Sequence, residues 1–83
     1  MPYIQQKQRI KLIPDDTKVA TEVGELNFML TTMCQQYFIA RGGRYQQIND
    51  IIGALECCKL EFYRRLVAPY EDKAIERNGD VYE

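Results

Sequence analysis

Apolar side chains recur every three or four positions along two stretches of the chain, the spacing of one buried helix face. The first stretch predicts a helix over 25–40, with apolar positions Leu26, Met29, Leu30, Met33, Cys34, Tyr37 and Phe38. The second predicts a longer helix over 45–67, with apolar positions Ile48, Ile51, Ile52, Leu55, Phe62 and Leu66. Between them lies Arg41-Gly42-Gly43-Arg44. Because glycine readily adopts positive φ, we expect a short turn here and antiparallel helices.

Two shorter helices are predicted on either side of this pair. The sequence Pro14-Asp15-Asp16-Thr17 is typical of a helix start, since proline fits the first turn and aspartate favours the positive end of the helix dipole. This helix should end near Glu22, before Gly24. Pro69 should end or kink the long helix, and a final helix is expected over 69–77.

The first thirteen residues are polar and basic, and we expect them to form an extended N-terminal arm. Pro2 disfavours helix, and Ile10 and Leu12 alternate with basic residues as in a short strand. The arm either packs on its own domain or crosses onto a neighbouring copy. The chain is therefore expected to be a single all-α domain, 1–83: a small antiparallel bundle of three to four helices over 14–78, with the arm at 1–13 and a tail at 79–83.

A chain of 83 residues fits one domain with little stability to spare. Ordering the residues costs roughly 1.5 kcal/mol each, or about 125 kcal/mol in total, and a domain of this size hides only about 60–65% of its unfolded surface. We therefore expect assembly into a homo-oligomer to contribute to stability. Gly53, in the middle of the long helix, predicts close packing between helices.

The composition excludes several chemistries. The chain has no histidine, which removes Ser-His and Cys-His nucleophile pairs and imidazole zinc sites. Its cysteines are odd in number and two are adjacent, so we expect reduced thiols in the cytoplasm instead of disulfides: Cys34, Cys57 and Cys58. No signal peptide or run of about 20 apolar residues is visible, so no membrane partner is expected. We also expect no cofactor.

Charge is distributed unevenly along the chain. The net charge is −1, but residues 1–13 carry +3, residues 14–58 carry −3, residues 59–65 carry +2 and residues 66–83 carry −3. A general nucleic-acid binder is normally basic overall, so this balance argues against nucleic acid as a partner. An acidic end and a basic end instead favour pairing within one copy or between copies.

Two groups of residues could bind a ligand. Glu56, Lys59 and Tyr63 share one helical stripe beside Arg64 and Arg65, where they either surround a ligand or form an exposed face with ion pairs between successive turns. The arginines flanking the two glycines either converge on a phosphate or are simply solvated at a helix end. The candidate ligand-binding residues are Arg41, Arg44, Glu56, Lys59, Tyr63, Arg64 and Arg65.

A catalytic function has weaker support. Glu22, Glu25 and Glu56 could hold Mg²⁺ or Mn²⁺ in a metal-dependent nucleotide hydrolase. Such an enzyme needs two pairs of carboxylates three residues apart, whereas Glu56 and Glu61 are five apart and lie on different helix faces. We therefore assign no catalytic residue and no metal site.

Four segments carry a resemblance to a known group of proteins: GELN over 24–27, LECCKLEFYRR over 55–65, VAPYEDK over 67–73 and NGDVY over 78–82. The chain resembles a small uncharacterised family of single-domain proteins from phages, bacteria and archaea. The resemblance implies a phage or prokaryotic cytoplasmic setting and no particular activity. From the missing catalytic repertoire, the small core and the opposite charges of the two ends, we expect a non-enzymatic, homo-oligomeric helical binding protein that binds or sequesters a phosphorylated or nucleotide ligand. The alternative is an interaction module that masks a host or viral protein through Phe62, Tyr63 and Arg65.

Overall fold

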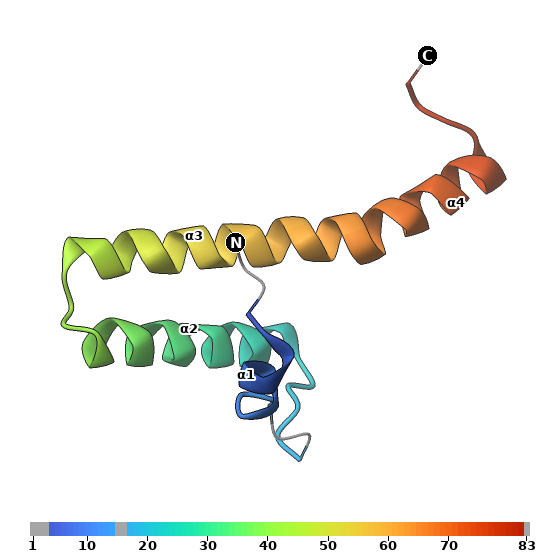
Figure 1. Ribbon diagram of the computed structural model, residues 1–83. Coiled ribbons are helices and arrows are strands. Elements are labelled where there is room, and N and C mark those ends of the chain that lie inside the picture. Colours follow the sequence, from blue (N-terminus) through green and yellow to red (C-terminus); the bar gives the residue numbers. More distant parts are fainter. Residues whose placement is uncertain (1–3, 15–16, 83) are drawn as a thin grey trace. The chain divides into compact units, whose positions relative to one another are not determined.

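The computed structural model describes residues 4–14 and 17–82, and in these ranges it contains helices and no strand (Figure 1). The all-α prediction is therefore confirmed. The elements are α1 Gln6–Ile10, α2 Val23–Ala40, α3 Tyr45–Phe62, the π-helical segment η1 Tyr63–Val67, and α4 Ala68–Asn78. The chain forms two compact units, which we call the N-terminal unit (Met1–Ile52) and the C-terminal unit (Gly53–Glu83).

The turn between α2 and α3 has the expected glycine conformation. Gly42 and Gly43 have φ of 108° and 63°, and their N–H groups donate to the carbonyls of Ile39 (3.3 Å) and Phe38 (2.8 Å). These two bonds form a Schellman motif, which satisfies carbonyls at the end of α2. A Cβ added at Gly43 would lie 3.3 Å from the Phe38 ring, so both the backbone and the available space favour glycine there.

A side-chain cluster joins α2 to the start of α3 within the N-terminal unit. The Tyr37 hydroxyl donates to Asp50 Oδ2 at 3.0 Å, and Gln46 Nε2 donates to Asp50 Oδ1 at 2.7 Å. Tyr37 is in the last turn of α2 and Asp50 in the second turn of α3. The polypeptide therefore reverses direction through the glycine turn, as the sequence predicts.

The start of α2 differs from the prediction. The helix expected over 14–22 is wrong: Pro14 and residues 17–22 are not helical, and positions 15 and 16 lie outside the described residues. Glu22 is the N-cap of α2, so Gly24 lies inside this helix. The physical reason is a local pair of hydrogen bonds, in which the backbone N–H and the hydroxyl of Thr21 both donate to Glu25 Oε1 at 2.8 Å.

The N-terminal arm contains a helical turn where the sequence pattern predicts extended chain. The Gln5 N–H donates to Gln8 Oε1 at 3.1 Å, which caps α1, and Arg9 Nε donates to the carbonyl of Ile4 at 2.9 Å. Alternation at Ile10 and Leu12 therefore produces no strand, because local capping favours the helix. Residues 1–3, including Pro2, lie outside the described part of the chain.

In the C-terminal unit the long helix continues past its proline. The Ala68 N–H donates to the carbonyl of Tyr63, five residues earlier, which is the π-helical pattern. Pro69 has no N–H, and its ring would clash with the carbonyl of residue 65 in a regular α-helix. The wider turn of η1 accommodates this clash, and α4 then runs on until Gly79, whose φ is 85°.

No described side chain of the single chain is buried. The least exposed large apolar residues, Phe38, Ile51 and Val67, are only half-buried, and Met29 at 37%, Leu30 at 40% and Leu55 at 40% are exposed. A Cβ added at Gly53 would meet no atom of the single chain within 4 Å, and the close helix packing expected there stays a prediction. The apolar stripes of the helices are thus present without a dry core. None of the described helices combines the length and apolarity needed to cross a membrane.

Candidate functional sites

The turn between α2 and α3 carries two of the predicted ligand-binding residues, Arg41 and Arg44. The Arg41 N–H donates to the carbonyls of Tyr37 and Ile39, and the Arg44 N–H donates to Gln47 Oε1 at 3.0 Å. Neither guanidinium forms an ion pair within the described ranges. The turn therefore presents two positive charges without an adjacent carboxylate to neutralise them.

The other five predicted residues lie in the C-terminal unit, where two carboxylates pair with three cations. Lys59 Nζ lies 3.1 Å from Glu56 Oε1. Glu61 Oε1 lies 2.5 Å from Arg64 Nη2 and 3.3 Å from Arg65 Nε. These are the i, i+3 and i, i+4 ion pairs of the solvent-exposed alternative, and an anionic ligand would have to compete with both carboxylates.

Tyr63 opens η1 beside these ion pairs. Its side chain is 54% exposed, and that of Phe62 just before it is 58% exposed. The C-terminal unit therefore presents two neighbouring aromatic rings next to the paired arginines. Large exposed aromatic side chains beside arginine are the residue types that most often anchor protein interfaces.

The carboxylates considered for a metal do not gather. In residues 4–14 and 17–82 no group of three Cys, Asp or Glu side chains could hold a metal ion. Glu25 instead accepts both hydrogen bonds from Thr21, and these bonds lower the pKa of Glu25. All three cysteines are free thiols, with Cys34 half-buried and Cys57 and Cys58 exposed.

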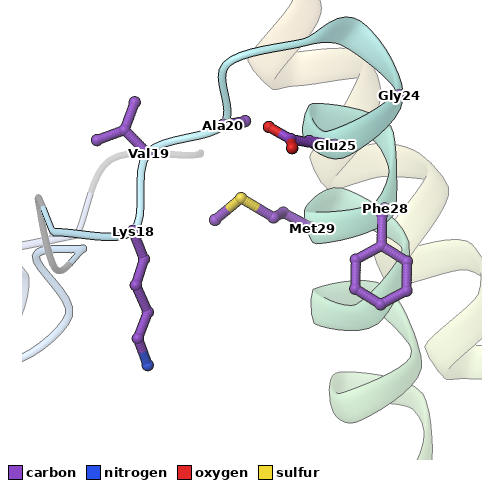
Figure 2. Close-up of a pocket in the computed structure, with 7 residues that line it drawn as sticks. All are labelled: Lys18, Val19, Ala20, Gly24, Glu25, Phe28 and Met29. Carbon is purple, nitrogen blue, oxygen red and sulfur yellow. The ribbon is translucent and has the colours of Figure 1, made fainter.

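The N-terminal unit also contains an apolar groove that the sequence patterns do not reveal. It lies between the non-helical segment 18–22 and α2, has a volume of about 590 Å³, and is lined by Val19, Leu26, Leu30 and Met33 among others. In an adjoining pocket of about 520 Å³, the Met29 side chain points toward the segment that carries Val19 (Figure 2). The groove is missed because a helix is predicted over 14–22. The sequence feature that could have revealed the groove is the spacing of Thr21 and Glu25. Thr21 donates two hydrogen bonds to Glu25 four residues later, and α2 therefore begins after Thr21.

One residue of the apolar stripe of α2 also makes a polar contact that its spacing does not predict. Tyr37 belongs to the apolar stripe of α2, yet its hydroxyl binds Asp50. This hydrogen bond raises the pKa of Tyr37, because the carboxylate stabilises the protonated phenol. Tyr37 thus contributes a ring to the apolar surface and a hydrogen bond to the hairpin.

Comparison with known proteins supports the resemblance seen in the sequence. No curated protein and no solved structure matches the chain. A family model described as a domain of unknown function, DUF6899, matches residues 1–81. The match spans nearly all of the 83 residues and agrees with a small, uncharacterised, single-domain family. The chain therefore belongs to the DUF6899 family.

Proposed function

We propose that this protein is a non-enzymatic helical binding protein that assembles with copies of itself. The observation that supports assembly most strongly is the absence of any buried apolar side chain in the described residues. Burying one large apolar side chain contributes about 1.5–3 kcal/mol, and a chain of this length needs many such contributions to offset its conformational entropy. Copies that cover each other's apolar stripes would supply them.

The direct test is the molar mass of the purified protein, measured by light scattering across a range of concentrations. We expect a mass that is a multiple of the 9.8 kDa chain at high concentration, decreasing on dilution. A folded protein that keeps the mass of one chain at all concentrations would contradict the proposal.

We further propose that the Arg41–Arg44 turn binds a phosphorylated or nucleotide ligand. The support is electrostatic: both guanidiniums lack a carboxylate partner in the described part of the chain, and the turn is short enough for them to converge on one phosphate. Lys59, Arg64 and Arg65 are paired with carboxylates, which makes them weaker anchors for an anion.

Thermal unfolding with nucleotides and cyclic nucleotides tests the ligand. A ligand present at 100 times its Kd should add about 2.7 kcal/mol to the free energy of unfolding. The shift should disappear in the variant carrying Arg41→Gln and Arg44→Gln and persist in the variant carrying Lys73→Gln and Arg77→Gln, which loses the same two charges in α4. No shift at millimolar ligand would contradict nucleotide binding.

The alternative is an interaction module that masks a host or viral protein in a prokaryotic, phage-infected cytoplasm. The exposed rings of Phe62 and Tyr63 beside Arg65 support this alternative, and the three free thiols fit a reducing compartment. Affinity capture should then recover one stoichiometric partner, and Tyr63→Ala should abolish the capture. Recovery that is unchanged by Tyr63→Ala would exclude this surface.

A further inference from the structure

The apolar positions of α2 alternate between spacings of three and four along its whole length. They are Val23, Leu26, Leu30, Met33, Tyr37 and Ala40, which we call the α2 seam. This is the spacing of the a and d positions in a coiled coil, where each side chain packs between residues of a facing helix. All six are exposed in the single chain, where Tyr37 reaches α3 through its hydroxyl and the seam as a whole stays accessible.

The α2 seam is symmetrical when it is read in reverse. Its midpoint lies between Thr31 and Thr32, and an identical helix running antiparallel about this point would place Leu30 opposite Met33 and Leu26 opposite Tyr37. Antiparallel coiled coils pair a positions with d positions in this way. A self-complementary surface of this kind is what a two-fold symmetric dimer requires.

The charges at the ends of α2 follow the same symmetry. Glu22 precedes the first seam residue and Arg41 follows the last, so an antiparallel copy would place each Glu22 opposite Arg41 of the other copy. The Glu22 side chain makes no capping hydrogen bond, and Arg41 forms no ion pair with the described carboxylates. A parallel copy would instead place like charges opposite each other.

The apolar groove lies along the same face of α2 as the seam. Four of the six seam residues line its α2 side together with Met29, and Val19 lies on the wall opposite; the four are Val23, Leu26, Leu30 and Met33. The part of a partner's seam that would reach this groove carries Met33 and Tyr37. Tyr37 binds Asp50 through its hydroxyl alone, which leaves the ring faces available for packing.

We propose that a second copy of this chain binds along the α2 seam with its own α2 antiparallel, paired through Glu22 and Arg41 at both ends. This inference rests on the proposed self-association and names the surface that carries it. The dimer buries both seams and pairs each Arg41 with a Glu22, which leaves Arg44 as the cation of the turn that remains for the proposed anionic ligand.

Charge reversal tests the pairing by sedimentation equilibrium. Glu22→Arg alone and Arg41→Glu alone should each raise the dimer dissociation constant about tenfold, because two attractive pairs become repulsive. An equimolar mixture of these two variants should restore wild-type affinity, since a mixed dimer has opposite charges at both ends. Gln35→Arg, a charge added on the same helix outside the seam, should leave the dissociation constant unchanged.

The results of these experiments distinguish a failure of the α2 seam as the interface from a failure of self-association itself. A wild-type protein that sediments as a single chain would overturn both the proposed assembly and this inference. A wild-type oligomer whose affinity is unaffected by Met33→Arg, or two charge variants that do not rescue each other on mixing, would overturn the α2 seam alone.

Cross-linking gives an independent readout of orientation. With Cys34, Cys57 and Cys58 replaced by alanine, a mixture of Val23→Cys and Ala40→Cys chains should form disulfide-linked mixed dimers on mild oxidation. Cross-links only between identical chains would overturn the antiparallel arrangement. Circular dichroism of each variant confirms that it has kept its helices.

Discussion

Replacing Gly43 with alanine should destabilise the hairpin of the N-terminal unit. Gly43 has φ of 63°, in the left-handed region, and its N–H completes the Schellman motif with Phe38 at 2.8 Å. An alanine in this conformation is strained by about 1–2 kcal/mol. Its Cβ would also lie 3.3 Å from the Phe38 ring, so the ring must shift.

The net effect follows from comparing this strain with the change in the unfolded chain. Alanine restricts the unfolded state more than glycine does, which favours folding by about 0.4–1 kcal/mol. The strain exceeds this gain and the Phe38 contact adds to it, so we expect Gly43→Ala to lower the free energy of unfolding by about 1 kcal/mol. Gly43→Asn should cost less than Gly43→Ala, because asparagine tolerates positive φ.

Urea unfolding followed by circular dichroism at fixed protein concentration measures both effects. The matched control is Gly53→Ala, which places a Cβ in open space within α3 and should raise stability by about 1 kcal/mol through helix propensity. Gly43→Ala as stable as wild type, or stabilised like Gly53→Ala, would refute the strained turn.

Two further changes probe individual hydrogen bonds, and a third probes the proline that follows η1. Glu25→Gln should weaken the cap that Glu25 forms with Thr21. Folding lowers the pKa of Glu25, so the ionised carboxylate stabilises the folded chain fully at neutral pH, and this stabilisation is lost as the pH falls through the lowered pKa. Circular dichroism should therefore show a smaller acid-induced loss of helix in the variant than in the wild type. The hydrogen bond to Asp50 stabilises the protonated phenol of Tyr37 and raises its pKa, so this bond is lost as the pH rises through the raised pKa. In an ultraviolet titration, Tyr37→Phe should therefore remove the one phenol signal that this bond shifts to higher pH. Pro69→Ala should convert η1 to regular α-helix and stabilise it by up to about 3 kcal/mol, seen as slower amide hydrogen exchange near Ala68.

The parts of the fold that the sequence predicts are those governed by local rules. The spacing of Leu26 to Phe38 predicts most of α2, and Gly42-Gly43 predicts the turn because few other residues adopt positive φ. Pro69 also predicts the irregularity at the end of α3, although not its form. A proline only requires that one hydrogen bond be absent, and a π-helical turn meets this requirement as well as a helix end does.

The errors arise where two local signals compete. Pro14 and the following acidic residues are typical of a helix start, but the Thr21 and Glu25 hydrogen bonds place the start nine residues later, at Val23. Ile10 and Leu12 alternate as in a strand, yet the cap at Gln5 favours a helical turn. Sequence spacing cannot rank such signals because each is worth only about 1 kcal/mol.

The candidate ligand-binding residues remain predictions. The sequence indicates ion pairs between successive turns of the long helix, and such pairs are present between Glu56 and Lys59 at 3.1 Å and between Glu61 and Arg65 at 3.3 Å. The sequence does not show that Arg41 and Arg44 lack carboxylate partners in the described residues. The pairing of these two arginines depends on where acidic residues distant in the sequence lie in the fold. The pairing proposed for Glu22 is missed for a different reason: the sequence predicts that this helix begins at residue 25, which leaves Glu22 outside it.

The dependence of thermal stability on protein concentration tests self-association most directly. If copies supply the apolar contacts that one chain lacks, folding and assembly are linked, and the midpoint of thermal unfolding should rise with each tenfold increase in concentration. A cooperative transition with the same midpoint at every concentration would show that a single chain folds stably alone, and would contradict the proposed assembly.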